Sequence, residues 1–429
     1  MNELQKHWRL PAVIAAMILV APCCICSQAI PLQQSPPSET PEPNVLSVLA
    51  PSLHLGSTDN GNSSFGSIGN GSNVFMFFTG NNDPALDEVV VTAVGDVMLG
   101  STFPDASGGE LPPNDGADLL KDVTPYLKEG DVVFGNLEGP LMDGGSSGKC
   151  RHKRPGSCYA FRVPTRYGAH LKAAGFNVMG LANNHALDFG QDGRASSRKT
   201  LETLGIAHSG EIGDIAWLSV KNKKVAVISF ATYPGAHNFL DLEDTVGVIR
   251  ETRAKADIVI VSFHGGAEGV THQHVPYSAE FFLGENRGDL RRFAHAAIDA
   301  GAQLILGSGP HVVRGMEIYH GKLIAYSLGN FATYGAINVS GVSGLSAVLK
   351  ARLAADGSFL SGCAYPTWQE KGSGPKIDSE KRILPILRSL SEEDFKQDAV
   401  QVGPNGELSL PGVQAGASEC TGVQQGSTH

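Results

Sequence analysis

The chain has 429 residues, 41% of them hydrophobic, which is enough to bury a full core in one large domain or two ordinary ones. Its formal net charge of −10 argues against general nucleic-acid binding, because a protein that neutralises phosphates needs a basic face. We therefore predict a folded protein without a nucleic-acid partner.

The amino-terminal segment, residues 1–29, has the pattern of a secretory signal peptide. Lys6 and Arg9 precede an apolar stretch over residues 10–21, and small residues suited to cleavage follow at 27–29. The apolar stretch is shorter than the roughly 20 residues of a membrane-spanning helix. We predict an extracytoplasmic protein, either secreted, periplasmic or at the cell surface. A retained N-terminal membrane anchor is the alternative.

Composition divides the rest of the chain into three parts. Residues 30–86 are rich in Pro, Ser, Asn and Gly, which is typical of a disordered linker. Over residues 87–411, short apolar runs alternate with stretches of helical periodicity, for example from Asp289 to Ala300. This alternation indicates an α/β layered domain. Residues 412–429 are predicted to form a tail.

Polar residues follow five apolar runs that we predict to be strands. These runs cover residues 89–94, 132–134, 178–181, 258–263 and 304–306. The polar residues that follow them are Asp96, Glu138, Asn184 with His185, His264 and His311. In open α/β sheets, ligands bind beyond the carboxyl ends of the strands, so residues there are placed for chemistry rather than for stability.

The strand ends together supply carboxylates, an amide and imidazoles. Hard oxygen ligands combined with imidazoles suit a divalent metal such as Mn²⁺, Zn²⁺ or Fe²⁺. Two such ions can clamp a phosphoryl group while generating hydroxide. Structural roles are the alternative. Asp96 and Glu138 could be helix N-caps or first-turn acids, Asn183 or Asn184 could cap a segment starting near Asp188, and His264 could be a hydrogen-bonded core histidine.

Four cysteines lie beyond the amino-terminal segment: Cys150, Cys158, Cys363 and Cys420. An even number in a chain predicted to be exported favours disulfides over metal binding or redox catalysis. Their close spacing makes Cys150 and Cys158 the expected local pair.

Four stretches of the sequence resemble the CapA family of capsule and poly-γ-glutamate synthesis proteins. They are Gly95–Gly100, Asn136–Leu141, Leu181–Gly190 and Tyr326–Phe331. The order of the strand-end residues is also similar to that of calcineurin-like metallophosphoesterases. The resemblance implies a layered metallophosphatase-like sandwich of mixed β-sheet flanked by helices. It further implies an extracytoplasmic location and a role in making or anchoring poly-γ-glutamate.

The resemblance also implies a role for each residue of the site. The implied metal ligands are Asp96, Glu138, Asn184, His264 and His311. Among them, Glu138 would bridge the metal ions. His185 would be the outer acid that protonates a leaving group, a role suited to an imidazole. Asn183, Asp188 and Glu268 would lie around these ligands.

Two positions depart from the phosphoesterase pattern. Met98 stands where a phosphoesterase has His two residues after the first Asp, although the CapA family shares this methionine. Gly309 stands where the family often has His before the Pro-His pair. Both departures remove an imidazole from the first metal position, so a single-metal or weakly occupied site is an alternative to a two-metal site.

Between Cys150 and Cys158 lies a basic run in an otherwise acidic protein. Its charged residues are Arg151, Lys153 and Arg154. Our hypothesis is that this run holds an anionic polymer such as poly-γ-glutamate near the site, and the alternative is a solvated loop.

We therefore predict an exported CapA-type protein of capsule or poly-γ-glutamate biosynthesis, with a divalent-metal site at the strand ends. One alternative is a metal-dependent hydrolase of a phosphoester or of γ-polyglutamate. Another is a non-catalytic protein that binds or anchors the polymer. The expected partners are the anionic polymer and membrane synthase proteins.

Overall fold

The computed structural model describes residues 88–104, 109–151, 158–335, 337–413 and 420. The predicted signal peptide (1–29) and linker (30–86) lie outside these residues. Among the described residues, no helix combines the length and the apolar character that crossing a membrane requires.

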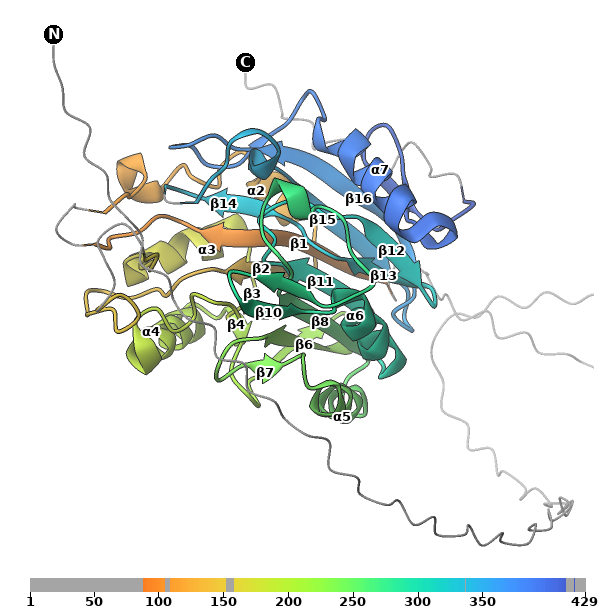
Figure 1. Cartoon of the computed structure of the whole chain (residues 1–429), viewed down its shortest axis with the longest axis horizontal. Coiled ribbons are helices and arrows are strands. Elements are labelled where there is room, and N and C mark those ends of the chain that lie inside the picture. Colours follow the sequence, from red (N-terminus) through yellow and green to blue (C-terminus); the bar gives the residue numbers. More distant parts are fainter. Residues whose placement is uncertain (1–87, 105–108, 152–157, 336, 414–419, 421–429) are drawn as a thin grey trace, which may run out of the picture. The chain divides into compact units, whose positions relative to one another are not determined.

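A ten-stranded mixed sheet forms one half of the protein (Figure 1). Its strands are β1 (Val89–Met98), β2 (Val132–Leu137), β3 (Val178–Gly180), β4 (Ala207–Ser209), β14 (Asn330–Thr333), β15 (Leu345–Leu353), β16 (Phe359–Trp368), β17 (Lys376–Ile377), β18 (Gln401–Val402) and β19 (Glu407–Ser409). The order is β18-β19-β16-β15-β1-β2-β3-β4, with β14 beside β1 and β17 beside β16. Strands β1 to β4 run parallel, so their carboxyl ends share one edge.

A seven-stranded sheet forms the other half. Its strands are β5 (Ala216–Val220), β6 (Lys223–Ala231), β7 (His237–Asn238), β8 (Ile258–His264), β11 (Leu304–Ser308), β12 (Met316–Tyr319) and β13 (Lys322–Ala325). The order is β12-β13-β11-β8-β6-β5, and its central strands β6, β8, β11 and β13 are parallel. A separate hairpin consists of β9 (Glu280–Phe282) and β10 (Glu285–Gly288).

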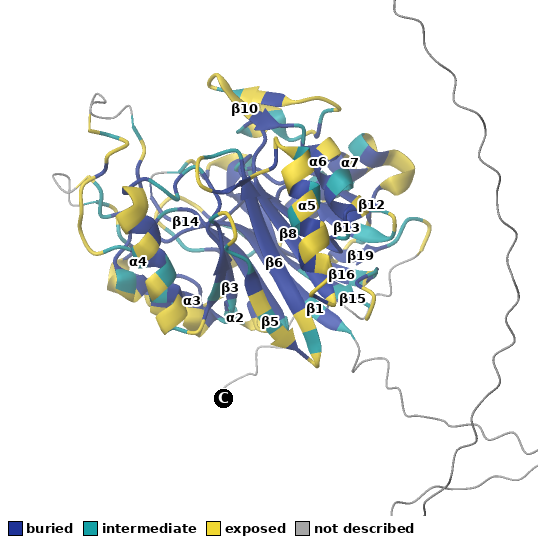
Figure 2. Ribbon diagram, turned by 90° about the horizontal axis from the view of Figure 1, so that it is seen from below, coloured by how far each residue is buried: buried dark blue, intermediate teal, exposed yellow. Residues whose placement is uncertain are grey.

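Helices cover the outer faces of both sheets. They are α2 (Thr124–Leu127), α3 (Gly168–Ala174), α4 (Gly190–Thr203), α5 (Leu242–Arg253), α6 (Leu290–Asp299) and α7 (Ile383–Phe395). Figure 2 shows α3 and α4 on one side and α5 and α6 on the other, with largely buried strands between them. Short 3₁₀ helices are η2 (Pro113–Gly116), η3 (Thr165–Tyr167), η4 (Val270–His272), η5 (Gly341–Gly344) and η6 (Lys396–Asp398).

The alternating direction of the side chains along each strand explains how these layers pack. Successive strand residues point to opposite faces. Val225 and Val227 of β6 therefore join the buried cluster between the two sheets, which also contains Val91 of β1. Ala226 and Ile228 instead pack beneath α5 and α6. The predicted layered α/β sandwich of mixed sheets flanked by helices is confirmed.

Local signals also produce the expected elements. The helical pattern from Asp289 to Ala300 forms α6, and the Asp289 side chain accepts a hydrogen bond from the Arg292 N–H as its N-cap. The predicted Cys150–Cys158 disulfide is present. A second disulfide joins Cys363 on β16 to Cys420 in the segment predicted as a tail.

Candidate metal centre

Strand ends from both sheets deliver side chains to one buried position. Asp96 lies near the end of β1 and Glu138 directly follows β2, both in the first sheet. His264 is the last residue of β8, and His311 follows β11, both in the second sheet. Asp96, Glu138 and His264 are completely buried. The site therefore lies where the two sheets meet.

The distances place four of the predicted ligands around one space. His311 Nδ1 lies 3.1 Å from Asp96 Oδ2, and His311 Nε2 lies 3.6 Å from Glu138 Oε1. His264 Nδ1 is 3.8 Å from Asp96 Oδ1, and its Nε2 is 3.9 Å from Glu138 Oε1. One ligand atom each from Asp96, Glu138 and His311 lie within 4.8 Å of one another.

Several of these buried atoms have no hydrogen-bond partner among the described residues. They are Asp96 Oδ2, which has only the His311 ion pair, Glu138 Oε1 and Oε2, Asn184 Oδ1 and His264 Nε2. Buried polar atoms are nearly always paired, since an unpaired one costs on the order of 1–3 kcal/mol. All of them are donor atoms that divalent metals accept as ligands. The residues present therefore fit a divalent cation.

The local backbone explains how these side chains come so close. An added Cβ at Gly95 would lie 2.0 Å from the carbonyl oxygen of Gly329, so only glycine lets β1 approach this turn. An added Cβ at Gly309 would lie 2.8 Å from the backbone nitrogen of Gly265, and the φ of Gly309 is 112°. The histidine that the family often has at this position does not fit this backbone.

Neighbouring amides hold the ligands in place. Asn136 Nδ2 donates to Asp96 Oδ1 at 2.8 Å and lies 3.2 Å from His264 Nδ1. Asn183 Nδ2 donates in turn to Asn136 Oδ1 at 3.0 Å. The sequence prediction missed this role of Asn136. Its position two residues before Glu138 was a usable signal, because residues at that spacing in an extended chain lie on the same face.

A second amide orients His311. Asn330 is the first residue of β14, and its Oδ1 lies 2.9 Å from His311 Nδ1. Its Nδ2 donates to the His311 backbone carbonyl at 3.1 Å. Asn330 belongs to the Tyr326–Phe331 stretch of the family resemblance, and it contacts a predicted ligand directly.

His185 lies at the side of the ligand cluster. Its Nδ1 is 2.7 Å from Asp188 Oδ2, and its Nε2 is 4.0 Å from Glu138 Oε1. The imidazole packs against the Phe161 ring, with 4.3 Å between the ring centroids. Since Asp188 occupies Nδ1, the other ring nitrogen faces the site.

The proposed structural roles do not account for the site residues. No helix begins at Asp96 or Glu138, which lie on or directly after strands. At the start of α4 no side-chain cap is made, and Asn184 Oδ1 accepts no hydrogen bond from the described residues. Asn183 Oδ1 does accept one, from the His185 N–H at 3.1 Å, in the turn that precedes α4. The His264 Nε2 is likewise unpaired, so this residue is not a satisfied core histidine.

Burial strongly perturbs the ionisable groups. Burial and the charge of Asp96 raise the pKa of the Glu138 carboxyl to about 8. Burial lowers the pKa of His264 to about 3. Burial also opposes charge on His311, but Glu138 and Asp96 outweigh it and raise the His311 pKa to about 10. Two carboxylates buried together need compensating positive charge, which protons or a bound cation supply.

The remaining predicted residues make contacts around the ligands, and the charge of Glu268 acts on the pKa values of Glu138 and His311. Glu268 forms an ion pair with Arg287. Asn183 and Asp188 contact Asn136 and His185 as described above. Arg151 is exposed, and Lys153 and Arg154 lie outside the described residues.

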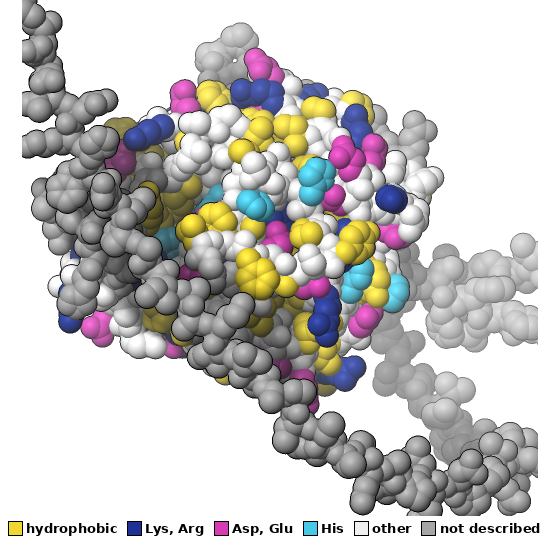
Figure 3. Space-filling model, in the orientation of Figure 1, with side chains coloured by type: hydrophobic (Ala, Val, Ile, Leu, Met, Phe, Trp, Pro, Cys, Tyr) yellow, Lys and Arg dark blue, Asp and Glu magenta, His cyan; other side chains and the backbone are white. Residues whose placement is uncertain are grey.

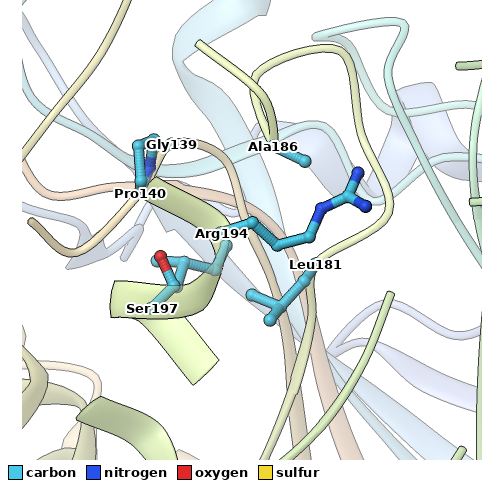
Figure 4. Close-up of a pocket in the computed structure, with 7 residues that line it drawn as sticks. Gly139, Pro140, Leu181, Ala186, Arg194 and Ser197 are labelled. Carbon is cyan, nitrogen blue, oxygen red and sulfur yellow. The ribbon is translucent and has the colours of Figure 1, made fainter. Parts of the chain in front are cut away.

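A small cavity lies behind the loop that carries His185. Its volume is about 10 Å³, close to the lower limit for one water molecule. Figure 4 shows the Arg194 side chain extending between Leu181 and Ala186 along this cavity. Arg194 is itself fixed by Glu211 at 3.0 Å. The cavity is too small for a substrate.

A family described as bacterial capsule synthesis protein PGA_cap matches residues 90–334. The capsule biosynthesis protein CapA of Bacillus anthracis is 28% identical over 269 residues, which cover 57% of this chain and 60% of that protein. The PGA biosynthesis protein CapA of Bacillus subtilis (strain 168) is 29% identical over 266 residues, covering 57% and 63%. The chain thus spans about three fifths of the length of these relatives.

Among solved structures, a putative 5'-nucleotidase from Staphylococcus aureus in complex with alpha-ketoglutarate is similar at a TM-score of 0.37. Its sequence identity is 15%, and the alignment covers 69% of this chain and 57% of that one.

Proposed function

The chain belongs to the bacterial capsule synthesis protein family PGA_cap, and from this premise we propose that it acts outside the cytoplasm in making or anchoring an anionic capsule polymer. Two relatives are named for capsule and PGA biosynthesis, which supports poly-γ-glutamate as the polymer. The two disulfides support an oxidising compartment, where such bonds persist.

The proposal includes a divalent metal, of the class Mn, Zn or Fe, at the strand ends. The observation that carries it is the set of unpaired buried atoms on Asp96, Glu138, Asn184 and His264. These residues and His311 would hold the ion, and Asn136 and Asn330 would orient them. When bound, such an ion acts as a Lewis acid and lowers the pKa of water.

A specific observation favours hydrolysis over a purely structural metal. His185 presents Nε2 towards Glu138 at 4.0 Å while Asp188 holds Nδ1. A side chain in this arrangement can pass a proton to a leaving group beside the metal ligands. We therefore favour a metal-dependent hydrolase that acts on a phosphoester or on the γ-linked polymer. A protein that only binds or anchors the polymer is the second candidate.

The proposed partners are the anionic polymer and membrane synthase proteins. On the face drawn in Figure 3, lysine and arginine side chains are scattered rather than gathered into one patch. On this face, polymer binding would rely on individual cations rather than on a broad electrostatic surface.

The test uses the full chain purified without chelator. We expect elemental analysis to find at least about one divalent metal per chain, as one closed ligand set implies. Incubation with poly-γ-glutamate should release shorter polymer, and incubation with a generic phosphodiester should release an alcohol and a phosphomonoester. Chelation should stop this release, and added Mn²⁺, Zn²⁺ or Fe²⁺ should restore it.

The alternatives give different results in the same experiment. Bound metal and polymer binding without any hydrolysis would establish the anchoring role instead. A metal-free protein that also fails to bind any of the three cations would overturn the metal centre.

A further inference from the structure

Asp188 is held on all sides by contacts that fix His185. Its carboxylate is completely buried, with Oδ2 paired to His185 Nδ1 and accepting from the Phe161 N–H at 2.8 Å. Its Oδ1 accepts from Lys149 Nζ at 2.6 Å. Its backbone carbonyl accepts from the Ser147 hydroxyl at 2.8 Å. The position of His185 therefore depends on the groups that surround Asp188.

These groups come from two short segments joined by a disulfide. We call residues 147–150 and 158–161 the clasp. Lys149 directly precedes Cys150, and Phe161 follows Cys158 by three residues. The clasp contains no helix or strand, so the disulfide is its covalent closure. Such a cross-link restricts the arrangements that two loop segments can adopt.

The clasp also touches His185 directly. The Phe161 ring packs on the imidazole, and Lys149 Nζ lies 3.4 Å from His185 Nδ1. Lys149 Nζ is also 3.4 Å from the Asn184 backbone carbonyl. The Lys149 side chain is 37% exposed, whereas Asp188 is not exposed at all. One partly exposed cation thus neutralises the buried carboxylate behind His185.

We propose that the clasp positions His185, with Lys149 as a positioning residue and the Cys150–Cys158 disulfide as the bond that keeps it in place. When the disulfide is formed, Lys149 and Phe161 hold Asp188, and Asp188 aims His185 Nε2 at the metal ligands. When it is reduced, the clasp opens and His185 loses its fixed orientation. The expected fall in kcat rests on the proposed hydrolytic function. The expected loss of a fixed His185 orientation does not depend on that function.

Reduction is a balanced two-electron exchange. A dithiol supplies two electrons and two protons, the Cys150–Cys158 bond becomes two thiols, and the dithiol becomes a disulfide. Hydrolysis would then be confined to oxidising compartments, because the reduced chain made before export lacks the ordered acid.

The first experiment compares Lys149→Met with Lys149→Arg. The matched control is Lys121→Met, which removes an exposed lysine between η2 and α2. We expect Lys149→Met to keep its bound metal while kcat falls by about 10–100-fold and KM changes little. Lys149→Arg should recover most of the loss, since it restores the positive charge. Wild-type kcat in Lys149→Met would overturn the proposal.

A spectroscopic measurement tests the position of His185 even if the protein shows no hydrolytic turnover. The ¹⁵N resonances of the His185 imidazole, assigned with His185→Ala, report which ring nitrogen carries the proton. In the wild type we expect Nδ1 always to carry a proton, donated to Asp188, so that Nε2 is the only ring nitrogen that takes up and releases a proton. In Lys149→Met we expect a mixture of forms. Unchanged resonances would overturn the clasp even if the hydrolase proposal had already failed for lack of turnover.

The second experiment removes each disulfide in turn. Cys150→Ser with Cys158→Ser should disturb the His185 resonances and lower kcat while metal content stays at the wild-type value. Cys363→Ser with Cys420→Ser is the matched control, because that disulfide joins β16 to a residue near the carboxyl end of the described chain and not to residues 147–150 or 158–161. Treatment of the wild type with a dithiol should reproduce the changes seen in the Cys150→Ser, Cys158→Ser variant, and these changes should not appear in the Cys363→Ser, Cys420→Ser variant. Equal behaviour of both pairs would contradict a specific role for the clasp.

Discussion

The two halves of the candidate site are built in different ways. In the ligand half, Asp96, Glu138, His264 and His311 lie at or just beyond strand ends and are fixed by two packed sheets. In the acid half, His185 lies on a loop after β3, and its orientation depends on contacts from the clasp. The two sheets thus hold the proposed metal ligands, and a disulfide-closed loop holds the proposed acid. Substitutions should be able to remove one half and leave the other.

The largest expected effect comes from removing a ligand. Asp96→Ala should lower metal affinity by more than about tenfold, since even residues behind metal ligands account for 10–100-fold. Polymer processing should be lost with the metal. Elemental analysis of the variant checks this, with Asp122→Ala as the control for losing an exposed aspartate on the surface. The fold should survive, because Asp96 also repels Glu138. Full metal content in Asp96→Ala would remove the distinction between the two halves.

Removing the acid should give the opposite separation. His185→Ala is expected to retain the wild-type amount of metal while turnover falls by about 10²–10⁴-fold, the usual contribution of general acid catalysis. Metal analysis and turnover measured on one preparation decide the matter. If metal and turnover fell together, His185 would belong to the ligand half.

The rigidity of the ligand half can be tested through a buried ion pair. Arg314 is completely buried and pairs with Glu280 at 2.7 Å, while also donating to the carbonyl of Ala267 in the loop after β8. Glu280→Ala leaves this charge unpaired, which should lower the free energy of unfolding by about 3–5 kcal/mol. Urea denaturation of the oxidised protein measures it. Glu251→Ala, an exposed change on α5, should stay within about 0.5 kcal/mol.

The smallest effect lies outside both halves. His208 on β4 contacts Asp214 at 2.9 Å and Glu202 at 3.1 Å. Burial lowers its pKa, but these carboxylates outweigh burial and raise the His208 pKa above 6.5. The interaction of protonated His208 with the two carboxylates therefore stabilises the fold fully at pH below 6.5. This stabilisation is lost as the pH rises through the pKa that His208 has in the folded protein.

Denaturation curves at several pH values measure this contribution. As the pH rises from below 6.5 through the folded pKa of His208, the free energy of unfolding of the wild type should fall by up to about 1 kcal/mol more than that of His208→Gln. Parallel curves for the two proteins would show that the histidine contributes nothing. The metal content of His208→Gln should equal that of the wild type, since neither half of the site is touched.

The sequence by itself determined the features that depend on neighbouring residues. An apolar run followed by a polar residue identifies a strand and what lies at its end, so Asp96, Glu138 and His264 could be selected without a structure. Close spacing likewise predicted the Cys150–Cys158 pair, and helical periodicity predicted α6. In each case the physical cause acts over a few residues of chain.

Only the tertiary structure decided which of these pieces meet. The order of strands in the two sheets brings Asp96 beside His264, although 168 positions separate them in the chain (264 − 96). Nothing near Lys149 in sequence shows that it contacts Asp188, and the reason for glycine at 309 is a backbone atom of Gly265. Such contacts are set by packing of whole sheets and loops, where the favourable terms come from residues far apart in the chain.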